Sequence, residues 1–285
     1  MPFDFDNLTH GTVFAERYEI IRELGRGGNS RVYLALDKAS ESAGAFAVAL
    51  KVCLQGKGDK KFIPRFLREA FQLSRLDHPN IMKLVDFGNQ GGVYYMATEF
   101  VNGLSLREHL KAGPVNEETA VVIGRELGRA FAHMKSLSVI HRDVKPDNIL
   151  VSEDDGRVIL VDFGLAKEEG QKTISTGDEF YGTPHFLAPE YIANSDDLTI
   201  KVDIYSLGMT LYHAVSGTLP FDAKTPVETI RRQMTEHPPN LTEVSSGITA
   251  DFAYVVDRMV EKDPAARMSL EEMTRSFQAL SAKYA

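Results

Sequence analysis

The segment His141-Arg-Asp-Val-Lys-Pro-Asp-Asn148 combines side chains that suit the transfer of a phosphoryl group. Asp143 offers a carboxylate that can accept the proton of an attacking hydroxyl, and Lys145 offers a positive charge for the group in transit. Asn148 adds an amide oxygen, a ligand type that Mg²⁺ accepts. The segment fits the pattern H-R-D-x-K-x-x-N at all five fixed letters, a coincidence expected about once in 10⁴ chains of this length.

A second carboxylate follows 14 residues after Asn148, in Asp162-Phe163-Gly164. Magnesium ions in proteins usually bind one or two carboxylates and complete their shell with substrate phosphates and water. Asn148 and Asp162 are therefore predicted as metal ligands.

A glycine-rich segment, Gly25-Arg-Gly-Gly-Asn-Ser30, lies between the β-rich runs Tyr18–Leu24 and Arg31–Leu36 and predicts the turn of a hairpin. Glycines at a hairpin tip allow backbone N–H groups to approach phosphate oxygens. The alternative is an ordinary flexible turn, and the loop alone does not decide between the two. A dinucleotide fingerprint is excluded because a strand follows, and a Walker A loop because no Gly-Lys-Ser/Thr occurs here.

Lys51 stands near the end of the apolar run Ala45–Val52, which is short enough to be a buried strand. A lysine at such a place costs desolvation unless it meets an anion. Glu69, in the amphipathic helix predicted over Phe62–Leu76, is well placed to be its partner. The alternative is a lysine that simply ends an edge strand, and this alternative explains Lys51 better when the residue is taken alone.

The surrounding elements predict an α+β protein. The hairpin Ile81–Phe87 and Val93–Val101 completes a five-strand sheet with one helix in the first hundred residues. The rest of the chain is predicted to be helical, and its one segment that is apolar nearly all round predicts a buried helix. These helices are expected at Glu117–Ser136, Val202–Ser216 (the apolar one), Pro226–Glu236, Ala250–Glu261 and Ser269–Ala282.

In their order along the chain, these motifs resemble those of eukaryotic-type serine/threonine protein kinases, and the lead-in to the glycine loop resembles bacterial members. The resemblance covers Tyr18 to Leu280 and implies a bilobal fold with ATP in the cleft. It divides the chain into a lead-in over 1–17 and a kinase domain over 18–280, with an N-lobe over 18–101 and a C-lobe over 102–280. Its motifs are the glycine loop, Val48-Ala-Leu-Lys51, Glu69, the segment around Asp143, Asp162-Phe-Gly, Gly182-Thr-Pro-His-Phe-Leu-Ala-Pro-Glu190, Asp203-Ile-Tyr-Ser-Leu-Gly and Arg267.

The resemblance implies roles for these residues. Asp143 would be the catalytic base assisted by Lys145, while Lys51 would contact the α- and β-phosphates and pair with Glu69. ATP and Mg²⁺ are the implied cofactors, with Mn²⁺ as a substitute metal. The implied nucleotide-binding residues are Leu24, Gly25, Arg26, Gly27, Gly28, Asn29, Ser30, Val32, Ala49, Lys51, Thr98, Glu99, Val101 and Leu150. Among them Ser30 replaces the third loop glycine, and Thr98 would be the gatekeeper before the hinge.

The same resemblance implies structural and regulatory residues. Arg267 is expected to pair with Glu190, and Asp203 to anchor the backbone of the catalytic segment. Arg142 and Lys167 would form a basic pocket for a negative charge on the activation segment. That charge would be a phosphate on Thr173, Ser175 or Thr176, or else the built-in carboxylate of Glu179, and the sequence leaves both possibilities open. Thr183 belongs to the Gly-Thr-Pro motif, which together with Lys145 favours Ser/Thr over Tyr specificity. Tyr205 stands where many eukaryotic members have Trp.

Composition limits the function classes. The chain has 285 residues, 32 Lys plus Arg against 40 Asp plus Glu, and a net charge of −8, which argues against nucleic-acid binding. A single cysteine, Cys53, excludes a disulfide framework, and no apolar run predicts a membrane span or secretory signal, so a cytoplasmic protein is expected. The expected partner is a protein substrate, with dimerisation left open. The alternatives are a pseudokinase scaffold, which would lack Lys51, Asp143 or Asp162, and a small-molecule kinase, which would lack a long activation segment.

Overall fold

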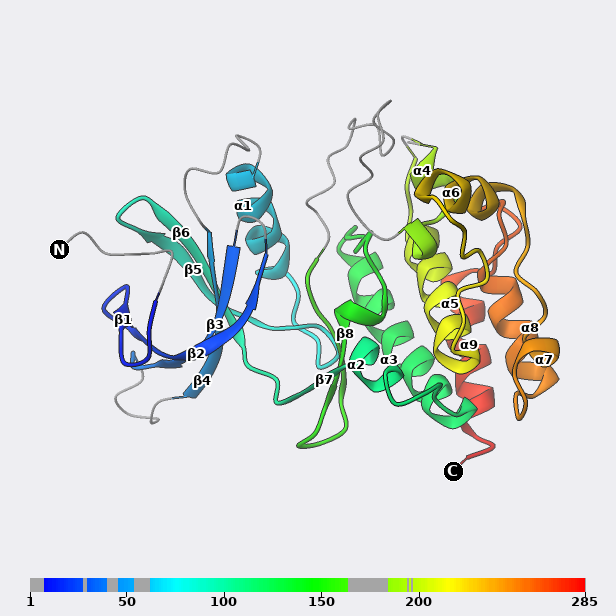
Figure 1. The fold of residues 1–285 in the computed structure, drawn as a ribbon, viewed down its shortest axis with the longest axis horizontal. Coiled ribbons are helices and arrows are strands. Elements are labelled where there is room, and N and C mark those ends of the chain that lie inside the picture. Colours follow the sequence, from blue (N-terminus) through cyan, green and yellow to red (C-terminus); the bar gives the residue numbers. More distant parts are fainter. Residues whose placement is uncertain are drawn as a thin grey trace. The chain divides into compact units, whose positions relative to one another are not determined.

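The computed structural model describes residues 8–27, 30–39, 46–53, 62–163, 184–193, 195 and 197–284. The chain divides into two compact units (Figure 1). The N-terminal unit comprises Met1–Asp77 and Met82–Asn102, and the C-terminal unit comprises His78–Ile81 and Gly103–Ala285. The first holds an antiparallel sheet with one helix and the second is mainly helical, which confirms the predicted α+β class.

The N-terminal unit is built on an antiparallel sheet of six strands in the order β1-β2-β3-β4-β6-β5. Buried and more exposed residues alternate along β3 and along part of β2, as expected for strands with one face on a core. The elements are β1 (Val13–Phe14), β2 (Tyr18–Arg26), β3 (Ser30–Asp37), β4 (Phe46–Cys53), α1 (Phe62–Leu73), β5 (Leu84–Gln90) and β6 (Val93–Glu99).

Five strands were predicted, and the sixth comes from the lead-in. Phe14 in β1 is fully buried and, with Leu8, belongs to the core of this unit. Arg17 fixes the segment by ion pairs to Asp37 (Nη2–Oδ2 2.6 Å) and to Asp86 (Nη1–Oδ2 2.7 Å). Leu8, Val13, Phe14 and Arg17 of the predicted lead-in are thus bound to the N-terminal sheet and its core. A two-residue strand has no periodicity to detect, because long-range contacts hold it.

The glycine hairpin is also tighter than predicted. Strand β2 extends to Arg26 and strand β3 begins at Ser30, so Gly25 and Arg26 are strand residues. Gly25 pairs with Val32 next to a register shift between Glu23 and Gly25. The turn is therefore shorter than the glycine pattern suggested.

The C-terminal unit packs helices around α5 and carries a small sheet in the order β7-β8-β9. The predicted helix at Glu117–Ser136 is present with those bounds, and α5 is buried on nearly every side, as its apolar sequence predicted. The elements are β7 (Gly103–Ser105), α2 (Leu106–Leu110), α3 (Glu117–Ser136), η1 (Pro146–Asn148), β8 (Ile149–Ser152), β9 (Val158–Leu160), η2 (Pro184–Phe186), α4 (Pro189–Ile192), α5 (Lys201–Ser216), α6 (Pro226–Thr235), α7 (Leu241–Val244), α8 (Ala250–Met259) and α9 (Leu270–Ser281).

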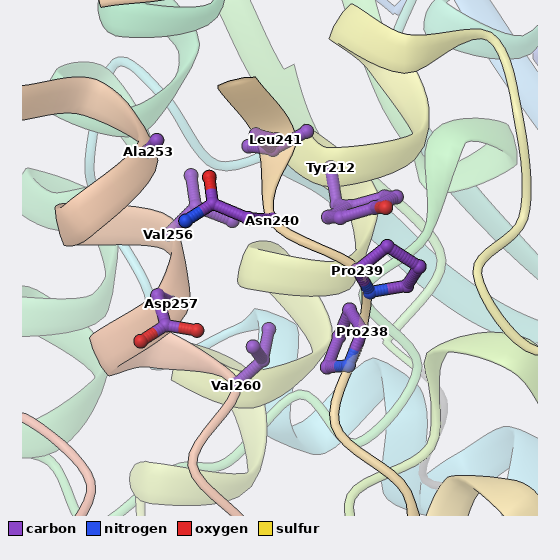
Figure 2. A pocket seen from close by; sticks show the side chains of 9 residues that line it. All are labelled: Tyr212, Pro238, Pro239, Asn240, Leu241, Ala253, Val256, Asp257 and Val260. Carbon is purple, nitrogen blue, oxygen red and sulfur yellow. The ribbon is translucent and has the colours of Figure 1, made fainter. Parts of the chain in front are cut away.

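A small pocket lies among α5, α7 and α8 of the C-terminal unit. Figure 2 shows this pocket, whose lining includes Tyr212 of α5, Pro239 before α7 and Val256 of α8. Its volume is about 10 Å³, which is room for a single water molecule. This pocket is a packing gap and not a ligand site.

Within the described residues, no helix has the length and hydropathy required to cross a membrane.

Candidate active site

Lys51 lies on an interior strand of the N-terminal sheet. Its strand β4 pairs with β3 on one side, where Val32 is its partner, and with β6 on the other, where Met96 is its partner. The Lys51 ammonium group lies 2.9 Å from Glu69 Oε1 and 3.1 Å from Oε2. The edge-strand alternative is therefore wrong, and the predicted pair is present, with both side chains largely buried.

The end of β6 carries Thr98, the predicted gatekeeper, and is followed by Val101, whose backbone N–H and C=O have no hydrogen-bond partner among the described residues. Thr98 is buried, and its hydroxyl lies 3.4 Å from the carbonyl oxygen of Ala49. The backbone N–H of Glu99 is already bonded to Lys83. In the described part of the chain, by contrast, the N–H and C=O of the buried residue Val101 have no partner. Buried backbone groups are nearly always satisfied, so this position fits a ligand edge with a donor and an acceptor, such as adenine.

The glycine hairpin leaves open space beside Gly25. The N–H of Gly27 donates to the carbonyl of Ser30 at 2.8 Å. A methyl group at Gly25 would meet no atom within 4 Å, and Leu24 beside it is an exposed apolar residue. Gly28 and Asn29 lie outside the described residues, so the phosphate-binding role of the loop stays a prediction. Of the remaining predicted nucleotide residues, Arg26 forms an ion pair with Glu23. Val32, Ala49 and Leu150 are half-buried side chains on β3, β4 and β8.

In the C-terminal unit, the predicted catalytic residues converge on one oxygen atom. Asp143 Oδ2 accepts hydrogen bonds from Lys145 Nζ at 2.6 Å and from Asn148 Nδ2 at 2.9 Å. Asn148 also donates to the Asp143 carbonyl at 2.8 Å. Among the described residues, the other carboxylate oxygen, Oδ1, has no hydrogen-bond partner. Asp143 is thus fixed through one oxygen while the second remains able to accept a proton.

Asp203 of α5 holds the backbone of this loop, as the sequence analysis expected. Its carboxylate accepts the N–H groups of His141 at 2.7 Å and of Arg142 at 2.8 Å. The side chain is fully buried, and burial raises the pKa of Asp203 to about 7 against the lowering effect of the two N–H groups. The loop therefore rests on a carboxyl group within the central helix.

His141 is held as a neutral imidazole. The N–H of Asp143 donates to its Nδ1 at 3.2 Å, so the ring proton is on Nε2, which donates to the Val161 carbonyl at 3.0 Å. Complete burial lowers the pKa of His141 to about 4. The imidazole also packs against the Phe163 ring with a centroid distance of 4.6 Å. His141 thus connects the catalytic loop to the residues on either side of Asp162.

Two residues of this region have a left-handed backbone. Arg142 has φ of 68° and Asp162 has φ of 52°, although neither is glycine. Such conformations cost of order 1–3 kcal/mol and persist where the surroundings impose them, most often at functional sites. The strain therefore marks the same two positions that the motifs selected.

The donor set fits a magnesium ion that is bound jointly with phosphates. Asn148 uses its amide nitrogen for Asp143, which leaves its oxygen for a cation, and the exposed Asp162 offers a carboxylate. Over the described ranges there is no group of three or more His, Cys, Asp or Glu that could hold a metal by itself. One amide and one carboxylate suit Mg²⁺, which keeps several ligands from water and substrate.

A buried ion pair fixes Glu190, the last residue of the predicted Gly182–Glu190 motif. Arg267 donates to both carboxylate oxygens of Glu190, at 2.6 and 3.0 Å, and also to the carbonyls of Glu261, Lys201 and Lys262. The predicted pairing of Arg267 with Glu190 is therefore present, and Arg267 is almost inaccessible to solvent.

Sequence reasoning missed two interactions beside the site. Gln233 of α6 is fully buried and donates to the carbonyls of His185 and Leu187 at 3.0 Å each. Arg107 of α2 pairs with Asp147 at 2.6 Å. Neither has a local sequence signal, since the partners lie about 40 or more residues apart. Several predicted regulatory residues lie outside the described residues: Lys167, Thr173, Ser175, Thr176, Glu179 and Thr183.

The fold and these residues define a protein kinase. The sequence pattern of the family described as "Protein kinase domain" matches residues 18–277, and the chain belongs to this family. It is 33% identical to the serine/threonine-protein kinase PrkC of Bacillus subtilis over 92% of this chain and 40% of PrkC. It is 34% identical to a probable serine/threonine-protein kinase PknB of Lactococcus lactis over 92% of this chain and 42% of that protein. The chain thus spans well under half the length of these relatives.

A solved structure supports the assignment of the fold. The kinase domain of PknI from Mycobacterium tuberculosis matches with a TM-score of 0.72 and 26% identity, over 96% of this chain and 99% of that domain. The predicted kinase fold and the predicted resemblance to bacterial serine/threonine kinases are confirmed.

Proposed function

We propose that the chain is an active kinase that transfers the γ-phosphoryl group of ATP to Ser and Thr hydroxyls of proteins, including its own. The observation that carries this proposal is the Asp143 carboxylate: Lys145 and Asn148 hold one oxygen, and the other has no partner among the residues that the structure describes. An oriented carboxylate with a free oxygen is the group that a hydroxyl nucleophile requires as a proton acceptor.

In this mechanism, Oδ1 of Asp143 accepts the proton of the substrate hydroxyl as its oxygen attacks the γ-phosphorus. The Lys145 ammonium group, bonded to the same carboxylate, offsets negative charge on the transferred group. Lys51, oriented by Glu69, positions the α- and β-phosphates. Asn148 and Asp162 would hold Mg²⁺, which when bound neutralises phosphate charge. The unpartnered backbone of Val101 would bind the adenine edge.

Both alternatives are weaker. A pseudokinase scaffold would have no need for the Lys51–Glu69 pair or for a fixed Asp143, and both are formed. A small-molecule kinase is disfavoured by the similarity to proteins named serine/threonine-protein kinases. We further propose that the domain acts in the cytoplasm, where ATP is available.

The experiment is incubation with ATP, Mg²⁺ and a generic basic protein, followed by mass spectrometry of the phosphorylated residues. We expect phosphoserine and phosphothreonine on both proteins, and a loss of roughly 10²-fold or more in Lys51→Met with little change in melting temperature. Lys38→Met, which removes an exposed lysine paired with Glu19, is the matched control and should stay active. Phosphorylation of small molecules alone would establish the small-molecule alternative, and a folded protein without any transfer would establish the scaffold.

A further inference from the structure

A hollow of about 190 Å³ lies in the C-terminal unit beside the catalytic loop. It is far larger than the roughly 10–15 Å³ that one water molecule needs. Its walls come from α2, from η1 and from the end of α5. The lining residues are Arg107, Leu110, Lys111, Pro146, His213 and Gly217.

The charged groups of this lining are cationic. Arg107 uses only its Nε to bind Asp147 Oδ1, at 2.6 Å, and in the described part of the chain its two terminal amino groups have no partner. Lys111 is exposed and adds a second positive charge. No carboxylate belongs to the lining; Asp147, which is outside it, pairs with Arg107 through Oδ1, so Lys111 supplies the net positive charge. The hollow is thus suited to an anion, since a guanidinium group with free donors can bind a carboxylate or a phosphate through two oxygens.

A histidine adds a polar atom with an unmet requirement. Nδ1 of His213 is buried and lacks a hydrogen-bond partner within the described residues. Burial lowers the pKa of His213, and the neighbouring Arg107 adds to this effect, while a hydrogen bond to the Thr218 backbone opposes it. A bound anion would supply hydrogen-bond acceptors for the terminal amino groups of Arg107 and a counter-charge for Lys111.

The hollow is close to the reacting groups through covalent and hydrogen bonds. Pro146 in its wall lies two residues before Asn148, whose amide binds the Asp143 carboxylate at 2.9 Å. A side chain bound in the hollow would therefore belong to a residue a few positions before or after the target Ser or Thr in the substrate peptide.

We propose that this hollow, named here the anion subsite, selects protein substrates that carry an acidic or phosphorylated side chain near the target Ser or Thr. The proposal rests on the proposed function and adds the substrate class. It assigns Arg107 and Lys111 to substrate recognition and not to catalysis.

The test is a scan of peptides with one serine, in which each flanking position carries Glu, Ala or Lys in turn. We expect about fivefold higher kcat/KM for Glu than for Ala at one position, the size expected for a partly exposed charge pair. Lys111→Glu should abolish this preference or turn it toward Lys, and Arg107→Gln should weaken it. Arg275→Glu, an exposed charge reversal on α9 outside the lining, is the matched control and should keep it.

A further arm replaces Glu by phosphoserine at the selected position. A higher kcat/KM for phosphoserine would identify the natural ligand as a phosphate from an earlier phosphorylation, and a higher value for Glu would identify a carboxylate. Transfer without any acidic preference, or a preference unchanged in both Lys111→Glu and Arg107→Gln, would overturn the anion subsite alone. Absence of transfer to every peptide and protein would overturn the proposed function, and the subsite with it.

Discussion

The ammonium group of Lys262 donates a 2.7 Å hydrogen bond to the hydroxyl of Tyr205. Tyr205 is the residue that replaces the tryptophan of many eukaryotic kinases, and an indole N–H could only donate, so it could not accept this bond. Lys262 also donates to the carbonyl of Gln233 at 2.7 Å and lies over the ring of Phe221. The replacement therefore has a physical partner, and Lys262 connects α5 to the helix whose Gln233 holds the backbone at His185.

This relationship predicts a pH dependence of stability. Burial lowers the pKa of Lys262 from 10.5 to about 7, so between these values the folded protein binds fewer protons than the unfolded chain. The free energy of unfolding contributed by Lys262 therefore rises with pH through this window and is lost as the pH falls through 7. Between pH 7 and 9, the stability of wild type relative to Lys262→Met should increase by about 2 kcal/mol. Urea unfolding at several pH values measures it, and a difference independent of pH would contradict the lowered pKa.

Alanine substitutions at two glycines of α3, Gly124 and Gly128, should affect stability differently. A Cβ at Gly124 would lie 2.3 Å from the ring of Phe277, which is completely buried in α9 and cannot move aside. A Cβ at Gly128 would lie 3.3 Å from the terminal methyl group of Met273, which is flexible. Gly124→Ala should therefore destabilise the protein by about 1–3 kcal/mol. Gly128→Ala should be neutral or gain up to about 1 kcal/mol from helix propensity. Chemical unfolding compares them, and equal effects would argue against this packing of α3 on α9.

The buried Thr98 predicts an inhibitor phenotype. If it is the gatekeeper, its small side chain leaves space behind the adenine site, and Thr98→Met fills that space. Inhibitors that extend behind adenine should lose at least ~10-fold in affinity, because a filled pocket excludes them by steric overlap. The KM for ATP should change far less. Calorimetric titration with such an inhibitor and with an ATP analogue measures both, and equal losses would show that the hinge lies elsewhere in the sequence.

The sequence predicted those parts of the fold and site that depend on local pattern. The amphipathic period gave α3 with its observed ends, and the contiguous segment around Asp143 located the groups that meet at one carboxylate oxygen. Contiguity is the reason, since residues within six positions in one loop are brought together by the loop itself. Lys51 and Glu69 are far apart in the sequence; the need of a buried lysine for an anion suggested the pair, and the resemblance supported it.

Features held by distant contacts could not be predicted. Strand β1 is too short to show a period, and Arg17 finds Asp86 across 69 positions of the sequence. The helix α2 and the strands β7 and β9 have too few residues for a pattern. Arg107, which lines the anion subsite, and Asp147 come from different elements, so their pairing appears only when the chain is folded.

The most direct test of the central claim is the rate of γ-phosphoryl transfer from labelled ATP to protein by wild type and by Asp143→Asn. Asparagine keeps the size and most hydrogen bonds of the side chain but cannot take the hydroxyl proton. The account predicts Mg²⁺-dependent labelling of Ser and Thr by wild type and a decrease of roughly 10²–10⁴-fold in Asp143→Asn. Asp251→Asn, which alters an exposed aspartate paired with Lys283, should label like wild type. A folded wild type that transfers no phosphate, or an Asp143→Asn variant as fast as wild type, would contradict it.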